Sequence, residues 1–136
     1  NDTVELAKEA ITMACRYLNA SSGVLYVIDE KKENLNLMAS FAYTTRDSLS
    51  NSFKVGDGVV GQVALERTPI LLKNIKDDSF SIQSGITLSK PKEVYTFPLI
   101  HEGELFGVAE IMSFDSFTKI HKDYLSKAST IFAAAL

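Results

Sequence analysis

The chain has 136 residues, of which 46% are hydrophobic and 23% are charged, and its net charge is −3. This composition is that of one globular domain, and it excludes a disordered chain and a basic face for nucleic acid. Because Cys15 is the only cysteine and no apolar run approaches about 18 residues, we expect no internal disulfide, no thiolate metal cluster and no membrane span.

The first predicted element is a helix over residues 3–19. Apolar residues recur there at steps of three and four, at Val4, Ala7, Ile11, Ala14 and Leu18. A second apolar stripe lies beside the first and consists of Leu6, Ala10, Met13 and Tyr17. Two interpretations remain open: the helix is buried on most sides, or it also packs on a partner.

Two strands are predicted next, over residues 24–28 and 35–43, joined by a polar turn into a hairpin. In the second strand the larger apolar residues alternate, at Leu35, Leu37, Ala39, Phe41 and Tyr43. After a polar loop and a glycine-rich stretch, we predict a short helix that ends before Pro69 and a strand at 70–72. Residues 74–93 form a long polar connection, which is typical of a functional or mobile segment.

A second hairpin is predicted from strands at 94–100 and 105–114. Pro98 cannot donate a backbone hydrogen bond, so its strand is expected at an edge or with a local irregularity. The last helix is predicted over 117–136 and has two overlapping apolar stripes. One is Ile120, Tyr124, Ala128, Ile131, Phe132 and Ala135, and the other is Leu125, Ala128, Phe132 and Ala135. This order of elements predicts an α+β fold, with an antiparallel sheet and terminal helices against one face.

Three glycines, Gly56, Gly58 and Gly61, have the spacing G-x-G-x-x-G, which occurs in phosphate-binding loops. A dinucleotide site needs a buried strand before the first glycine, a long helix after the third and a βαβ unit, and none is predicted here. A protein kinase needs H-R-D and D-F-G motifs, which the chain lacks. We therefore expect the glycines to shape a tight turn and to let a short helix approach the sheet.

No arrangement of residues predicts catalysis. His101 lies in a predicted hairpin turn and His121 in the first turn of a helix, where each is expected to be a surface residue. Cys15 is expected to be a small core residue and not a reactive thiol. Glu110 is the one ionisable residue within a strongly apolar strand, and it is either a paired structural carboxylate or a polar anchor in a ligand pocket.

Several sequence segments together resemble the GAF domain, a signalling module, over essentially the whole chain. These are FKVGDGVVGQVALERTPILLKNI, VYTFPLIHEGELFGVAEIMSF and FTKIHKDYL. The words SFAYTTRDSLSNSFKVGDG and SFSIQSG are most similar to GAF modules of bacterial sensor histidine kinases. The resemblance implies a central antiparallel sheet of five or six strands, terminal helices that dimerise on one face, and a pocket on the other face under the short helix and long loops.

Carried over to this chain, the resemblance implies a pocket lining drawn from several elements. The candidates are Phe41, Tyr43, Phe53, Val60, Phe80, Ser81, Ser84, Tyr95 or Phe97, and Glu110 or Met112, with the face of each strand left open. The implied dimer helices carry Leu6, Ala10, Met13, Tyr17, Leu125, Ala128, Phe132 and Ala135.

The chain departs from two ligand-binding branches of the family. The cyclic-nucleotide motif survives only at Phe117, because Met112-Ser113 and His121-Lys122 occupy its other places. Covalent bilin attachment needs a cysteine in the pocket, whereas Cys15 lies in the first helix. We therefore expect neither cofactor. Related methionine sulfoxide reductases use several cysteines, so the single cysteine also argues against that enzyme.

The sequence thus predicts one non-catalytic regulatory domain over residues 1–136, excised from a larger signalling protein. It is expected to form a homodimer, to bind an unknown small molecule, and to relay a signal to an attached output domain such as a histidine kinase. The expected location is cytoplasmic, with a parent protein anchored in the inner membrane. The alternative is a structural dimerisation spacer whose aromatic residues fill the pocket.

Overall fold

The computed structural model describes residues 2–42, 51–75, 82–84 and 87–136. The elements in chain order are α1 (Asp2–Leu18), β1 (Ser22–Ile28), β2 (Asn34–Phe41), β3 (Ser52–Lys54), α2 (Gly58–Glu66), β4 (Ile70–Lys73), β5 (Ile82–Ser84), β6 (Thr87–Ser89), β7 (Glu93–His101), β8 (Glu104–Ser113) and α3 (Lys119–Ala135).

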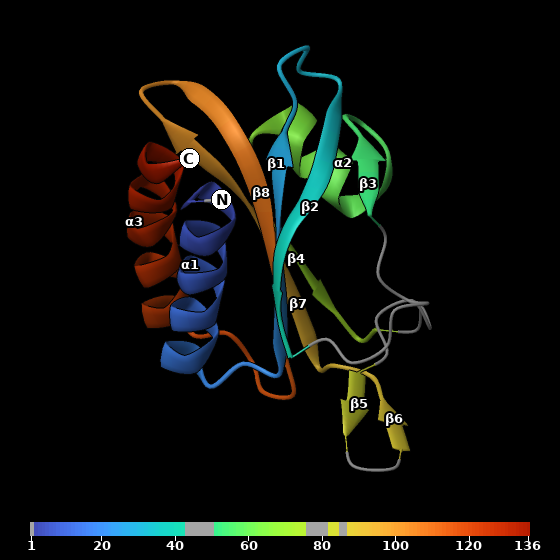
Figure 1. Cartoon of the computed structure of the whole chain (residues 1–136). Coiled ribbons are helices and arrows are strands. Elements are labelled where there is room, and N and C mark those ends of the chain that lie inside the picture. The colour runs from blue at the N-terminus through green and yellow to red at the C-terminus, as the bar shows by residue number, and fades with distance from the viewer. Residues whose placement is uncertain (1, 43–50, 76–81, 85–86) are drawn as a thin grey trace.

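Six of the strands form one antiparallel sheet in the order β3-β2-β1-β8-β7-β4, and β5 pairs with β6 in a separate hairpin. Helices α1 and α3 lie side by side on one face of the sheet, and α2 lies on the other (Figure 1). The fold is therefore α+β with terminal helices on one face, as predicted. β1, β8 and β7 are the central strands that both layers share.

The larger core lies between the sheet and the terminal helices. From α1 it receives a buried stripe that includes Ala7, Ile11 and Cys15. Gly23 of β1 lets the helix approach closely, because a Cβ atom there would lie 2.6 Å from the Cys15 sulfur. From α3 the core receives Leu125, which is fully buried. Cys15 is thus a packing residue, as expected.

A second core lies between α2 and the opposite face of the sheet. Val60 and Val63 of α2 are buried among Tyr26, Leu35 and Val108 of the sheet. The aromatic rings of Tyr26 and Phe53 meet edge to face, with centroids 5.3 Å apart. α2 therefore covers this face with apolar contacts that reach β3, β7 and β8.

The glycine-rich stretch has the structural role that the sequence predicts. Gly56 and Gly58 have positive φ angles, 96° and 65°, in the turn that leads into α2. A Cβ atom at Gly61 would lie 2.3 Å from the Lys54 carbonyl oxygen. The glycines thus allow the turn and a close approach of α2 to β3.

Irregularities in two strands change which side chains share a face. The pairing of β1 with β2 shifts between Leu25 and Tyr26, which leaves Met38 as an extra residue in β2. The pairing of β7 with β8 shifts between Leu99 and Ile100. A β-bulge of this kind reverses the facing of all residues beyond it relative to simple alternation.

Pro98 lies within β7 and pairs with Val108 of β8. On the other side of β7, the pairing with β4 ends at Thr96, two residues before the proline. β7 is therefore a local edge at Pro98, as expected for a residue without a backbone N–H group.

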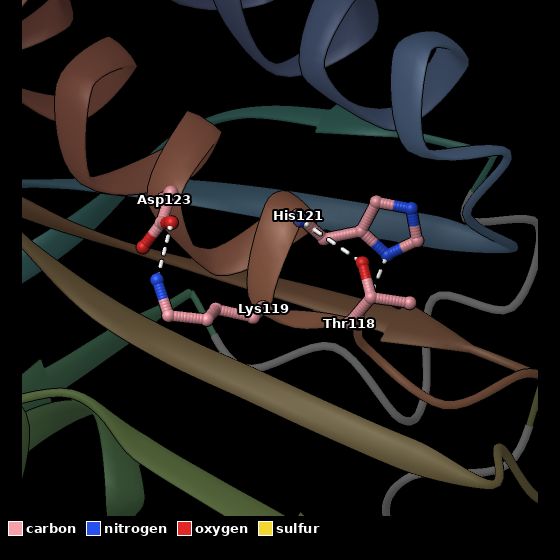
Figure 2. Close-up of polar contacts among 4 residues, drawn as sticks. All are labelled: Thr118, Lys119, His121 and Asp123. Carbon is pink, nitrogen blue, oxygen red and sulfur yellow. Dashed lines mark hydrogen bonds and ion pairs between the residues drawn. The ribbon is translucent and has the colours of Figure 1, made fainter.

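The start of α3 is fixed by a reciprocal cap, drawn in Figure 2. The Thr118 hydroxyl accepts a hydrogen bond from the His121 backbone N–H at 3.1 Å. The His121 ring Nδ1 accepts one from the Thr118 N–H at 3.2 Å. Lys119 and Asp123 form an ion pair at 3.0 Å across the first turn of the helix. His121 is therefore a capping residue that takes the place usually held by Glu or Gln.

We expect Thr118→Ala to lower the free energy of unfolding by about 1 kcal/mol, because the first turn of α3 loses its side-chain cap. Thermal or urea denaturation measures this loss. Thr118→Ser, which keeps the hydroxyl, is the matched control and should stay close to the wild type. Equal stability of the alanine and serine variants would show that the cap contributes nothing.

Candidate functional site

Glu110 is the most unusual polar residue of the sheet. It lies in β8 between Val24 of β1 and Thr96 of β7, and this row faces the α2 side. Its side chain is only 6% exposed. The Thr96 hydroxyl donates a hydrogen bond to the Glu110 carboxylate Oε2 at 2.7 Å. A carboxylate is therefore held at the centre of an apolar sheet face.

Burial raises the pKa of the Glu110 carboxyl from 4.5 to about 7, and the Thr96 hydrogen bond opposes this rise. The physical cause is desolvation, because a charge in an apolar environment loses the stabilisation that water gives it. Glu110 can therefore gain or lose a proton near neutral pH while it stays inside the protein. A carboxyl of this kind can bind a cation or change its charge in response to its surroundings.

Two further polar side chains lie near Glu110. Ser22 pairs with Met112 in the next row of the same face, so it is diagonal to Glu110. The Ser22 hydroxyl is buried, and its oxygen has no hydrogen-bond partner among the residues that the structure describes. Burial raises the pKa of the Tyr26 phenol above its usual range, and the nearby Glu110 charge raises it further. We call Ser22, Thr96 and Glu110 the polar cluster.

Sequence reasoning found Glu110 and missed Ser22, Thr96 and Tyr26. Ser22 precedes the strand that was predicted, and Thr96 lies inside a strand that was read only for its apolar residues. The signal that finds Thr96 is its pairing with Glu110 across the β7–β8 hairpin, which requires the exact register.

Four of the predicted pocket residues lie on the α2 side of the sheet. They are Phe53, Val60, Glu110 and Met112. Val60 and Phe53 belong to the core beneath α2, whereas Met112 packs with Val94 beside the polar cluster. The sequence did not predict on which face of the sheet Glu110 and Met112 of β8 lie. The structure places both on the α2 side.

Three other predicted pocket residues lie on the wrong face. Phe41, Tyr95 and Phe97 all pack into the core beneath the terminal helices. Phe41 is there because the bulge at Met38 reverses the facing of the last part of β2. Tyr95 and Phe97 are there because the alternate residues Val94 and Thr96 face the α2 side. The expectation that they line a pocket under α2 is therefore wrong.

The remaining pocket candidates cannot be placed. Tyr43, Phe80 and Ser81 lie outside the described residues, and Ser84 belongs to β5, of which only the backbone is described.

The predicted dimer residues lie mostly around a groove between α1 and α3. This apolar groove has a volume of about 250 Å³, and its lining includes Leu6, Ala10, Met13, Phe132 and Ala135. Several large apolar side chains on these helices are exposed: Leu6 by 44%, Met13 by 64%, Tyr17 by 59% and Ile131 by 69%. The rings of Tyr17 and Tyr124 pack together, with centroids 4.3 Å apart.

Leu125 and Ala128 do not belong to that exposed surface. They are 0% and 7% exposed, because this side of α3 packs on the sheet. The prediction that these two residues form part of a dimer face is therefore wrong. The two stripes of the last helix share Ala128, Phe132 and Ala135, so periodicity alone did not separate the inner stripe from the outer one.

The cysteine and the histidine of the β7–β8 turn lie apart from the polar cluster in the part of the chain that the structure describes. Burial raises the pKa of the Cys15 thiol to about 12, and the nearby Lys8 opposes this rise. His101 lies 3.7 Å from Glu102 at the β7–β8 turn. Within the ranges that the structure describes, no three His, Cys, Asp or Glu side chains come together as a metal site.

The family model that describes the GAF domain matches residues 1–136 of the chain. The chain therefore belongs to the GAF domain family, whose members are generally regulatory or sensory modules. No curated protein sequence is significantly similar to it. In the described part of the chain, no helix has the length and apolar character that a membrane crossing requires.

Solved structures with the same fold come from proteins of several kinds. The GAF domain of a phosphoenolpyruvate-protein phosphotransferase from Coxiella burnetii has a TM-score of 0.78 and 20% identity, over 98% of this chain and 81% of that one. The second GAF domain of DevS from Mycobacterium smegmatis has a TM-score of 0.75 and 15% identity, over 98% and 91%.

An enzyme also shares the fold. The type II free methionine-R-sulfoxide reductase from Thermoplasma acidophilum has a TM-score of 0.70 and 19% identity, over 98% of this chain and 94% of that one. At these identities the likeness concerns the fold alone, so catalysis has to be judged from the residues of this chain.

Proposed function

We propose that this GAF domain is a non-catalytic regulatory module of a signalling protein. It senses a small molecule at the α2 face of the sheet and relays this event through paired terminal helices to an output domain such as a histidine kinase. The observation that carries the proposal is the exposed apolar surface of α1 and α3, on the face opposite to Glu110. Exposed apolar patches of this kind mark protein interaction sites.

The sheet provides the physical connection between the two faces. Glu110 and its neighbours Ala109 and Ile111 alternate along β8, so the latter two pack in the core under the terminal helices. A shift of β8 at the polar cluster therefore moves residues that touch that core. A coupling of about 1–3 kcal/mol between the two faces is enough for regulation.

The lack of catalysis is supported by the state of the one cysteine. Cys15 is 0% exposed, and its thiol is held in the protonated form by burial. A buried thiol with a raised pKa is a poor nucleophile and a poor redox centre. A reductase activity would need the Cys15 sulfur to reach a substrate. Its position in the core between α1 and the sheet prevents this contact.

A structural dimerisation spacer is the second candidate. It is favoured by the tight packing of α2, whose Val60 and Val63 are 2% and 0% exposed against the sheet. A thermal-shift screen of metabolites separates the two functions. A ligand at 100 times its dissociation constant adds about 2.7 kcal/mol of stability to a sensor and nothing to a spacer.

We expect Met13→Glu to weaken dimerisation by at least about tenfold, because a charge would be buried against the partner helix at a cost above about 1.4 kcal/mol. Light scattering after size exclusion, over a concentration series, measures the effect. The matched control is Leu65→Glu, an apolar residue of α2 with 59% exposure on the other face of the sheet. This variant should dimerise like the wild type. A wild type that stays monomeric at every concentration would contradict paired helices.

A further inference from the structure

We infer that the polar cluster recognises the ammonium group of a small molecule that also has an apolar part. This inference deepens the proposed sensory function, because it names the chemistry of the ligand. It rests on three observations made among the described residues: a buried carboxylate without a cation, a buried hydroxyl without a hydrogen-bond partner, and apolar side chains around both.

The first observation concerns the charge of Glu110. Among the described residues, its carboxylate accepts one hydrogen bond, from Thr96, and forms no ion pair with a Lys, Arg or His side chain. Burying an ionised carboxylate is costly unless a cation compensates for the lost hydration. An ammonium group of a ligand would supply this cation. An anionic ligand would meet a like charge and would be repelled.

The second observation is the Ser22 hydroxyl. It is 1% exposed, and within the described ranges its oxygen has no hydrogen-bond partner. Such a buried orphan is costly and calls for an explanation. Residues in diagonal positions on two paired strands lie about 7–8 Å apart, with their Cβ atoms somewhat closer, so one group can bridge the side chains of Ser22 and Glu110. An ammonium group has three donors, of which one can bind Glu110 and one Ser22.

The third observation is the apolar surroundings of the cluster. Val24, Val94 and Met112 flank Ser22, Thr96 and Glu110 on the same face, and each is buried to at least 99%. Apolar side chains beside a few fixed polar groups are typical of small-molecule sites. Because the side chains of Val24 and Val94 are hydrocarbons, the part of the ligand next to the ammonium group should be a hydrocarbon chain.

The test follows the titration of Glu110 in the folded wild-type protein by 13C NMR of its carboxyl carbon, between pH 5 and 9. The probes are ammonium, methylammonium and n-butylammonium chloride. Sodium n-butyrate and n-butanol are the matched anionic and neutral probes, and sodium chloride at equal ionic strength is the reference. Measurements with Ser22→Ala and with the surface control Glu104→Gln show whether the cluster is responsible.

We expect n-butylammonium to lower the midpoint of the Glu110 titration, by one pH unit at saturation if it binds the ionised form about tenfold more tightly. Butanol and butyrate should not lower it. Ser22→Ala should reduce the shift, and Glu104→Gln should leave it unchanged. Equal midpoints in all three ammonium salts and in sodium chloride would overturn the inference. Light scattering on the same samples measures dimerisation separately. A failure of the proposed relay can therefore be distinguished from a failure of the ammonium inference.

Discussion

Replacing Glu110 with Gln is expected to raise the free energy of unfolding at pH 8 by up to about 3 kcal/mol. The wild type has to keep an ionised carboxylate in an apolar site at this pH, whereas the amide carries no charge. Burial raises the pKa of the carboxyl from 4.5 to about 7, which sets the size of the effect. The amide oxygen can still accept the hydrogen bond from Thr96.

The direction of the pH dependence follows from the raised pKa. Between pH 4.5 and about 7 the unfolded chain has released the Glu110 proton while the folded protein retains it. The folded state therefore binds more protons, and the stability of the wild type falls as pH rises through this window. Above about pH 7 both states are ionised, so this contribution becomes constant. Glu110→Gln should lose this fall in stability.

Urea denaturation at pH 5 and at pH 8 measures both effects through the midpoint concentration. Glu104→Gln, at an exposed position of the same strand, is the control and should keep the pH dependence of the wild type. If Glu110→Gln were less stable than the wild type at pH 8, the carboxylate would have a stabilising partner, and the interpretation of Glu110 as an uncompensated charge would be wrong.

Gly61→Ala is expected to destabilise the protein by about 1–3 kcal/mol, although helix propensity alone predicts that alanine stabilises a helix by about 1 kcal/mol. The sign reverses because the new Cβ would lie 2.3 Å from the Lys54 carbonyl oxygen and 3.0 Å from the Gly56 nitrogen. These are backbone atoms, so α2 has to move away from β3. This movement would disturb the packing of Val60 and Val63.

Thermal denaturation of Gly61→Ala and of Gln62→Ala compares two substitutions at neighbouring positions of α2. Gln62 is only partly buried, so its change to alanine should stay within about 0.5 kcal/mol of the wild type. A Gly61→Ala protein as stable as the wild type would show that α2 adjusts freely. In that case the glycines would not be needed for the close approach of the helix.

The three helices and the strands β1, β2, β4, β7 and β8 could be predicted from the sequence because each depends on local periodicity and turn residues. The short strands β3, β5 and β6 were missed, because they lie in segments that the sequence predicts as loops. The sequence did not predict which face of the sheet each strand residue lies on. A two-residue turn at Glu102 and Gly103 pairs Ile100 with Leu105, and the same count would place Thr96 opposite Ala109. The shift in the strand pairing between Leu99 and Ile100 places Thr96 opposite Glu110 instead. One extra residue thus brings Thr96 and Glu110 into positions where they can form a hydrogen bond. No sequence pattern predicts this extra residue.

The buried face of α1 was largely predictable, whereas that of α3 was not. Of the first stripe of α1 only Val4 is exposed, by 43%, and the exposure of Leu6, Met13 and Tyr17 argues against a helix buried on most sides. In α3 both stripes pass through the same small residues, and Ser129 and Ala133 complete the buried side. Only packing against β7 determines that Leu125 points inward and Ile131 outward.

The central claim is that a change of charge or ligand at the polar cluster changes how the terminal helices of two copies of the chain pair. It is tested most directly by the dimer dissociation constant at pH 5.5 and at pH 8.5, for the wild type and for Glu110→Gln. We expect the constant of the wild type to change by about fivefold or more between these pH values, beyond any change in the variant. The same ratio of constants in both proteins would contradict a connection between Glu110 and the terminal helices.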